Sequence, residues 1–228
     1  MKTLRELIAE DLGLPKPKEP TIKESYVTAA QKYDLPTELL SEKTKSEHQK
    51  LLAKYVDSLN TVAAKLDTAD RESANPNHSE YRDLKGDEVF NLNASFLHAL
   101  YFENISDLKS VVTMDSMAFL RIERDFGSFD AWQKDFIAAA LSSRGGWAIT
   151  SYNVFLGRYI NTPIDSHNIN VPFNSIPCIV INVGEHAYYR DYLSDRKTYV
   201  YAMMKELNWD VIEKRFKKAE KVAKIMGR

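Results

Sequence analysis

The chain has 228 residues, which is the size of one large domain or of two small ones that share an interface. Its 31 basic and 32 acidic residues leave a net charge of −1, so no overall field favours binding to nucleic acid or to anionic lipid. A hydrophobic content of 44% supports a dense core and excludes a disordered chain. The chain also has a single cysteine, Cys178, and shows no signal peptide and no membrane-spanning apolar run. Together these features predict a soluble, cytoplasmic protein.

Residues 1–34 are expected to form an arm and a linker. Apolar residues recur at helical spacing in this segment: Leu4, Leu7, Ile8 and Leu12. The proline-rich stretch 15–20 that follows predicts a stiff linker. Two interpretations of the short helix stay open: it folds back on its own domain, or it is a docking arm for a partner in a larger assembly.

Residues 35–105 predict a helical hairpin domain. A long helical pattern covers 39–66, and a second helix is expected over about 88–103. The polar stretch 67–87, which contains proline and glycine, is expected to connect the two helices.

Residues 106–228 predict an α/β domain. Helical patterns are expected over about 116–125, over 130–142 with Ser128 as N-cap, near Arg190, and from Asp210 onward. The segments 147–160 and 178–181 are rich in β-branched and aromatic residues and predict strands. Helices followed by strands and further helices give an α+β order.

The C-terminal end is basic. Residues 213–228 contain seven Lys or Arg residues and two Glu residues, a net charge of +5. One interpretation is a solvated helix end favoured by the helix dipole, and the other is contact with phosphates or with an acidic partner of a larger assembly. Apart from such contacts, no nucleic acid and no membrane is expected as a partner.

The histidines are candidate metal ligands. The chain has five: His48, His78, His98, His167 and His186. Three of them lie on apolar faces of predicted elements that are far apart in sequence, an arrangement that can converge on one buried metal. Spacing alone is a weak signal, because a lone histidine on a helix is more often an ordinary hydrogen-bonded side chain than a ligand.

One C-terminal motif points to a family. The segment Asn182-Val-Gly-Glu-His-Ala-Tyr-Tyr-Arg-Asp-Tyr192 resembles the pattern Asp-x-Trp-Glu-His-Ala-Tyr-Tyr-x-x-Tyr of the iron/manganese superoxide dismutases. Three further stretches agree in the same order: Ser41 to Thr44 with His48 and Tyr55, Phe90 to His98, and Phe126 to Trp147. The resemblance covers about residues 35–216. It implies a helical hairpin packed on an α/β domain with a small antiparallel sheet, and one Fe or Mn ion between them.

The resemblance also implies the ligands. They are His48, His98 and His186, with Asn182 at the position of the family's ligating Asp. A neutral amide balances less of the charge on the cation than a carboxylate does. This departure is therefore expected to weaken metal binding and to favour the reduced metal.

Further positions are assigned by the same resemblance. Tyr55, Trp147 and His167 correspond to residues beside the substrate and the metal-bound solvent. Glu185 and Tyr189 correspond to residues that join the two subunits of a homodimer.

Other positions depart from the family. Gly184 replaces a tryptophan, the family's gateway histidine falls at Leu51 or Leu52, and the spacing from His48 to Tyr55 is one residue shorter than in the family.

Three functions follow from these matches and departures. The missing carboxylate favours a protein with impaired or absent dismutase activity that serves as a structural or interaction component of a larger assembly. The alternative is an active Fe/Mn superoxide dismutase, which converts superoxide to oxygen and hydrogen peroxide at an atypical site. A third interpretation is a structural or storage site for Zn²⁺.

Overall fold

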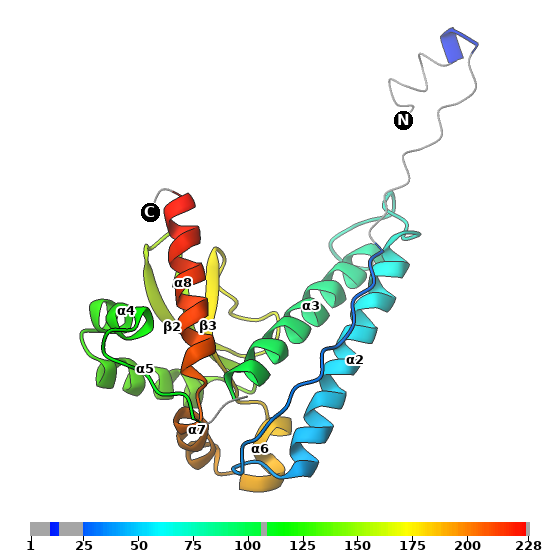
Figure 1. The fold of residues 1–228 in the computed structure, drawn as a ribbon. Helices are drawn as coiled ribbons and strands as arrows, with labels where there is room; N and C mark the ends of the chain where they lie inside the picture. The colour runs from blue at the N-terminus through cyan, green and yellow to red at the C-terminus, as the bar shows by residue number, and fades with distance from the viewer. Residues whose placement is uncertain (1–9, 14–24, 106–108, 227–228) are drawn as a thin grey trace.

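The computed structural model describes residues 10–13, 25–105 and 109–226. Two long helices, α2 (Glu42–Leu66) and α3 (Glu80–Asn104), lie side by side as a hairpin (Figure 1). The remaining elements are α4 (Met117–Phe126), α5 (Phe129–Ser142), β1 (Trp147–Asn153), β2 (Arg158–Ile164), β3 (Ser175–Asn182), α6 (Glu185–Tyr192), α7 (Arg196–Lys205) and α8 (Trp209–Ile225). The expected α+β fold, a helical hairpin followed by a small antiparallel sheet with helices, is confirmed.

The hairpin helices begin at serine N-caps. Ser41 Oγ accepts a hydrogen bond from the Thr44 backbone N–H at the start of α2. Ser79 Oγ does the same for Arg82 at the start of α3. The prediction that the connector extends to residue 87 is wrong, because the Ser79 cap starts α3 eight residues earlier and Gly86 lies inside the helix.

The second half follows the predicted order with one correction. Ser128 Oγ accepts from the Ala131 N–H, so the expected N-cap of α5 is confirmed. The strands expected over 147–160 are confirmed as β1 and β2, which a turn after Asn153 separates. The helix expected near Arg190 begins at Glu185 as α6, directly after β3.

The sheet has the order β2-β1-β3, and both pairs are antiparallel. Side chains alternate along the central strand, so that Trp147 and Thr150 point to opposite faces. The Trp132 indole N–H of α5 donates to Thr150 Oγ1 on one face. Trp147 packs against His98 of α3 on the other face. The sheet therefore lies between α3 of the hairpin on one face and α5 of the second half on the other.

One hydrophobic core extends through both halves of the chain. Its buried members include Leu52 and Tyr101 of the hairpin, and Trp132, Trp147 and Phe216 of the second half. A smaller cluster of Val62, Leu66, Ala69 and Leu84 closes the far end of the hairpin. The division into domains at residue 105 stays a prediction, since a single core crosses it.

An extended segment, residues 25–41, runs along the length of α2 (Figure 1), and we call it the strap. Two side-chain amides of α2 hold it. Gln49 Oε1 accepts from the Tyr33 N–H and its Nε2 donates to the Tyr33 carbonyl. Asn60 makes the same pair of bonds with Thr28. The two spacings agree, because eleven helical residues and five extended residues both span about 16.5 Å.

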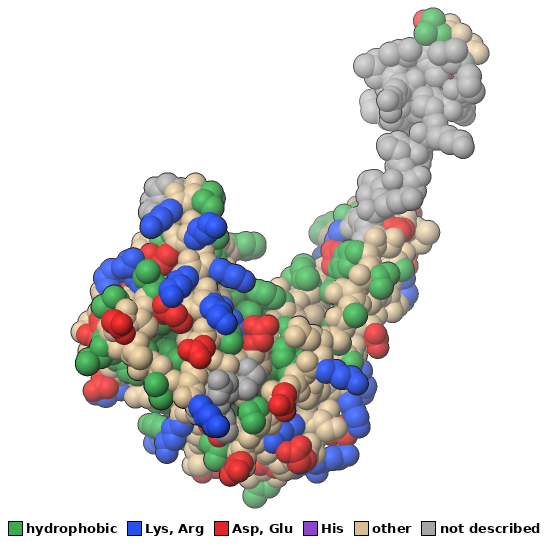
Figure 2. Space-filling view, in the orientation of Figure 1, with side chains coloured by type: hydrophobic (Ala, Val, Ile, Leu, Met, Phe, Trp, Pro, Cys, Tyr) green, Lys and Arg blue, Asp and Glu red, His purple; other side chains and the backbone are tan. Residues whose placement is uncertain are grey.

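The last helix, α8, carries the basic residues of the C-terminal end. Figure 2 shows Lys and Arg side chains gathered along its outer face. The exposed lysines of α8 are Lys214, Lys217, Lys218, Lys221 and Lys224. Arg215 differs, because it is buried and its guanidinium forms an ion pair with Glu103 of α3 at 2.8 Å. This basic residue therefore joins α8 to the hairpin instead of contributing to the exposed face.

The predicted N-terminal amphipathic helix lies largely outside the described residues. Glu10 and Asp11 are helical, and Gly13 has a positive φ of 61°. Within the described part of the chain, no helix combines the length and apolarity needed to cross a membrane.

Candidate metal centre

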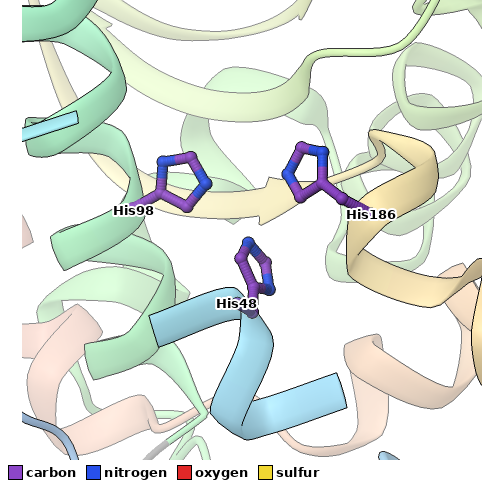
Figure 3. Close-up of side chains that lie close together, drawn as sticks. All are labelled: His48, His98 and His186. Carbon is purple, nitrogen blue, oxygen red and sulfur yellow. The ribbon is translucent and has the colours of Figure 1, made fainter. Parts of the chain in front are cut away.

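Three histidines from three elements meet where the hairpin joins the sheet. His48 comes from α2, His98 from α3 and His186 from α6, and their candidate ligand atoms lie within 4.8 Å of one another (Figure 3). Among the described residues, this is the one such group of metal-binding side chains, and it includes no carboxylate. His48 and His98 are buried, whereas His186 keeps an exposed edge. The structure thus brings together the three histidines that the resemblance assigned as ligands.

The junction between β3 and α6 places His186. Asn182 ends β3, Gly184 is the N-cap of α6, and His186 follows in the first helical turn. A Cβ atom at Gly184 would lie 2.7 Å from His186 Cε1 and 2.9 Å from the Gly145 carbonyl oxygen. The glycine that replaces the family's tryptophan is therefore required by this path of the backbone and by this position of the imidazole.

The His98 ring has a defined tautomer. Its Nδ1 lies 2.6 Å from the carbonyl oxygen of Ala94, one turn earlier in α3. A carbonyl oxygen can only accept, so Nδ1 holds the hydrogen and Nε2 presents a lone pair to the cluster. Burial lowers the pKa of His98 to about 3, which keeps the ring neutral near pH 7.

The other two imidazoles are neutral for the same reason. Burial sets the pKa of His48 well below its ordinary value, and the neighbouring histidines lower it further. Burial lowers the pKa of His186 to about 4. Three neutral imidazoles that face one point are a donor set that transition metals accept, so the residues present fit a metal ion.

Asn182 lies at the centre of this cluster and is fully buried. Its Oδ1 accepts the backbone N–H of Gly184 at 2.8 Å. A backbone N–H can only donate, so this bond fixes the amide orientation and turns the NH₂ group toward the histidines. Nδ2 lies 3.2 Å from His48 Nε2, 3.4 Å from His98 Nε2 and 2.9 Å from His186 Nε2. In this orientation the amide offers hydrogens, not a lone pair, at the fourth ligand position.

The backbone of Asn182 is fixed by two buried tyrosines. Tyr199 of α7 donates its hydroxyl hydrogen to the Asn182 carbonyl oxygen at 2.8 Å. The Tyr101 hydroxyl of α3 lies 3.0 Å from that of Tyr199 and completes the chain. Sequence reasoning missed Tyr101, although it shares a helical face with His98.

Trp147, His167 and Tyr55 form a hydrogen-bonded chain beside the cluster. The Trp147 indole N–H donates to His167 Nδ1 at 3.1 Å, and His167 Nε2 lies 3.1 Å from the Tyr55 hydroxyl. The indole can only donate, so Nδ1 is the acceptor and the neutral ring keeps its hydrogen on Nε2. Nε2 then donates to the Tyr55 oxygen, which leaves the hydrogen of the Tyr55 hydroxyl free for another acceptor.

The neutral state of His167 follows from its surroundings. Burial, with a smaller contribution from the neighbouring His186, lowers its pKa to about 4. Burial also raises the pKa of Tyr55, so its hydroxyl stays protonated. The two side chains therefore keep one hydrogen-bond direction through the neutral pH range.

Two residues of α3 hold His167 in place. Asn93 Nδ2 donates to the His167 carbonyl oxygen at 2.8 Å. The Phe90 ring packs edge-on against the imidazole, with 4.7 Å between the ring centroids. Sequence reasoning missed Asn93, although its place one helical turn after Phe90 could have indicated it.

Glu185 and Tyr189 lie apart from this chain, on the outer side of His186. They border a hollow of 370 Å³ that is also lined by Thr44, Glu47, His186, Arg190 and Leu193. Both side chains are exposed in the single chain, and Tyr189 keeps 51% of its surface accessible. Of the two residues expected at the position of the family's gateway histidine, Leu51 is half-buried and Leu52 is buried in the core.

Fold and site together define a metalloprotein whose centre lies between a helical hairpin and a three-stranded sheet. Residues 115–215 match the family description "iron/manganese superoxide dismutases, C-terminal domain".

Curated relatives extend the match. An iron superoxide dismutase of Aquifex aeolicus is 41% identical over 170 residues, which cover 73% of this chain and 79% of the relative. An iron superoxide dismutase of Methanothermobacter thermautotrophicus is 35% identical, with 74% and 82% covered. A manganese superoxide dismutase of Mycolicibacterium smegmatis is 32% identical, with 74% and 80% covered. The chain belongs to the iron/manganese superoxide dismutase family.

These relatives correct one expectation. They are named as superoxide dismutases, for iron or for manganese. Neither they nor the described structure support the expected loss of activity or the structural role in a larger assembly. The alternative, an active enzyme, is the better supported of the two.

Proposed function

We propose that this protein is an active superoxide dismutase, which uses iron or manganese to convert superoxide to oxygen and hydrogen peroxide. The observation that supports this proposal is the convergence of His48, His98 and His186, as neutral imidazoles, beside the Tyr55–His167 hydrogen bond. A scaffold has no need for three imidazoles that face one another, two of them buried, since each is costly to protonate.

The proposed ligands are His48, His98 and His186, with Asn182 at the fourth position. An iron or manganese ion bound there would supply the one-electron redox chemistry that the reaction requires. The Ala94 carbonyl keeps the His98 lone pair directed inward. The sheet and the hairpin exclude water from His48 and His98, which keeps both rings neutral.

Asn182 is the residue that distinguishes this site. Turning its Oδ1 toward the histidines would break the bond to the Gly184 N–H and leave that buried donor unpaired, at a cost of about 1–3 kcal/mol. A neutral amide also balances no positive charge. We therefore infer that the chain retains its metal less strongly than a carboxylate-containing site would, and that the reduced metal is favoured.

The residues beside the cluster supply the proton path. Formation of hydrogen peroxide consumes two protons for every two superoxide ions. Tyr55 accepts from His167 Nε2, so its own hydrogen is available for donation into the site. Trp147 fixes the opposite side of the His167 ring and thereby keeps this direction. Tyr55 is the proposed proton donor, and Trp147 and His167 are the residues that position it.

We also propose a homodimer that uses the face around Glu185 and Tyr189. The hollow on this face reaches the exposed edge of His186, so a second subunit would cover that histidine. Partner contacts through the N-terminal arm or the basic residues of α8 stay predictions.

Metal analysis and an assay of superoxide removal test the proposal together. We expect about one Fe or Mn ion per chain and rapid removal of superoxide, both lost in His98→Ala. The matched control is His78→Ala, since His78 is exposed in the connector far from the cluster. A preparation with stoichiometric metal that removes superoxide no faster than the free ion would overturn the proposed activity. A preparation that takes up only Zn²⁺ would overturn the proposed metal.

A further inference from the structure

Five exposed lysines form a stripe along the outer face of α8 (Figure 2). They recur three and four residues apart, so they share one side of the helix: Lys214, Lys217, Lys218, Lys221 and Lys224. The buried side chains of α8, such as Phe216 and Ala219, lie on the opposite side and pack into the core. This lysine stripe therefore points away from the core, and at 1.5 Å per residue it extends over about 15 Å.

Little of the positive charge of the lysine stripe is neutralised within the chain. Lys217 forms an exposed ion pair with Glu213 at 3.1 Å. Glu220 pairs with Arg121 of α4 at 2.9 Å instead of with the stripe. Within the described residues, the other four lysines of the stripe have no acidic partner. They are free to contact an anionic partner.

The charge of the chain is unevenly distributed. Residues 213–228 carry +5, so the rest of the chain carries −6. An anionic surface attracts α8 and repels the remainder of the molecule, although the net charge of the whole chain is only −1. The uneven distribution would therefore orient the lysine stripe toward such a surface.

An apolar side chain lies among the lysines at the free end of α8. Ile225 is 75% exposed, one helical turn after Lys221 and two turns after Lys218. The next residue, Met226, is also exposed. Because water solvates apolar side chains poorly, burying them against a partner is favourable. The surface thus combines positive charge with exposed apolar side chains.

The other end of the lysine stripe has the same combination. The loop before α4 lies against the first turn of α8, because the Asp210 N–H donates to Ser110 Oγ at 2.9 Å. Two apolar side chains of this loop are largely exposed, Val111 and Met114. Apolar side chains therefore border the stripe at both ends.

We propose that the outer face of α8 is a docking surface for an anionic lipid bilayer. The lysines contact the headgroup phosphates, and Ile225 and Met226 enter the boundary between headgroups and acyl chains. A basic patch with a small apolar anchor gives reversible attachment. The opposite face of α8 stays packed in the core, so docking requires no change of fold. None of these residues belongs to the proposed metal centre, so the inference does not depend on the proposed dismutase activity.

The side chains of the stripe favour lipid over nucleic acid. The phosphates of a nucleic acid would contact the lysines but would leave Ile225 and Met226 in water. The described part of the stripe also includes no aromatic side chain that could stack on a base and no exposed arginine that could read one. A bilayer accommodates the lysines and the apolar side chains together.

Co-sedimentation with vesicles tests the docking surface. The full-length protein is expected to bind phosphatidylcholine vesicles that contain about 30% phosphatidylglycerol at least about tenfold more tightly than vesicles of phosphatidylcholine alone. Salt at about 0.5 M should abolish this difference. Metal-depleted protein should bind equally well, which separates this result from the proposed dismutase activity.

Two sets of variants locate the contact. Reversing the charge of three stripe lysines is expected to lower the affinity for anionic vesicles at least about tenfold, since each lysine contributes to the attraction: Lys218→Glu, Lys221→Glu and Lys224→Glu. The matched control reverses three exposed lysines on other helices and should keep the affinity: Lys54→Glu, Lys134→Glu and Lys197→Glu. Ile225→Ser, which changes no charge, should lower the affinity about threefold or more.

Equal binding to the two kinds of vesicle would overturn the proposal, as would full binding by the variant with three reversed stripe lysines. A third contrary result concerns a DNA duplex of about 20 base pairs, compared with anionic vesicles at equal phosphate concentration. If the duplex binds more tightly and Ile225→Ser leaves that binding unchanged, the surface serves nucleic-acid phosphates instead of a bilayer.

Discussion

At the scale of single residues, the centre depends on one amide. Asn182 has two amide hydrogens but faces three imidazole nitrogens, and its oxygen is engaged by Gly184. The amide can therefore satisfy at most two of the three nitrogens without a cation, because neutral donors face neutral acceptors. A carboxylate of the same shape would instead present an acceptor and a negative charge to the same nitrogens. The residue therefore sets the balance between the metal-free and metal-bound cluster.

Asn182→Asp is predicted to increase metal retention by about tenfold or more, since the carboxylate supplies both a ligand and a charge. Metal content after dialysis against a chelator measures the effect. Asn77→Asp, at an exposed position in the connector, is the control for added charge. Equal retention by the Asn182→Asp variant and the wild type would show that the amide does not limit metal binding.

Tyr55→Phe is predicted to lower superoxide turnover by about tenfold or more with unchanged metal content, because the ring remains and only the proton donor is lost. Rapid-mixing kinetics of superoxide decay give the rate, and metal analysis of the same sample gives the content. Tyr201→Phe, at an exposed position on α7, is the matched control. Loss of metal along with activity would instead indicate a structural role for the hydroxyl.

The buried histidines predict the pH dependence of stability in the metal-free protein. Burial lowers the folded-state pKa of His98 to about 3, and those of His167 and His186 to about 4. As pH falls below about 6.5, the ordinary pKa of histidine, the unfolded chain takes up protons first. The free energy of unfolding is thus expected to be highest above that pH and to fall toward pH 4.

The slope of the free energy of unfolding against pH distinguishes histidine protonation from other causes of acid destabilisation. One proton of difference gives about 1.4 kcal/mol per pH unit, and several histidines titrating together give more. Urea unfolding of chelator-treated protein at pH 7, 6 and 5 measures it. Stability that does not change over this range would contradict the neutral, buried state of these rings.

At the scale of elements, the strap shows how a helix can hold an extended chain without a sheet. Gln49 and Asn60 each bond both the N–H and the C=O of one strap residue, as a neighbouring strand would. The strap then reaches the second half of the chain, where Tyr192 donates its hydroxyl hydrogen to the Leu39 carbonyl. It thereby connects the hairpin with α6.

Asn60→Ala is predicted to destabilise the protein by about 1–2 kcal/mol, because two hydrogen bonds of about 0.5–1.5 kcal/mol each are lost in a solvent-accessible position. Hydrogen exchange of residues 25–32 should accelerate, while that of the α3 segment stays unchanged. Lys54→Ala, also on an exposed position of α2, is the control. Unchanged exchange of the strap would mean that apolar packing alone holds it.

The sequence predicted the elements better than their ends. The ends of the helices depend on their capping residues. The Ser79 cap lies in a polar stretch whose composition favours a loop. The same is true of the site, whose residues were predicted better than their geometry. His48, His98 and His186 are separated by long stretches of chain, so only the family pattern joined them, and no pattern gives the orientation of the Asn182 amide. Asn93 was missed because its role depends on a backbone carbonyl of a distant loop.

At the scale of the whole molecule, the two halves share a core and a metal centre, but His186 keeps an edge open to solvent. Glu185 and Tyr189 surround that edge, so assembly and metal retention should be coupled. Covering the edge with a second subunit would remove the route by which water reaches the third imidazole directly from this face.

The double substitution Glu185→Ala and Tyr189→Ala is predicted to shift the protein from dimer to monomer and to accelerate metal loss. Sedimentation velocity gives the oligomeric state, and a chelator competition gives the rate of metal loss. Val222→Ala, on the exposed side of α8, is the control. A dimer that survives the double substitution would place the subunit contact on another face.

The two departures from the family motif, at Asn182 and at Gly184, differ in how easily a substitution could reverse them. Asn182 differs from the family's usual residue by one group of similar shape, so a single substitution can restore the motif there within the existing backbone. Position 184 cannot be restored in this way, because any side chain there would displace the His186 ring or the Gly145 peptide. A return to the full motif would therefore require the loop before β1 and the start of α6 to change together.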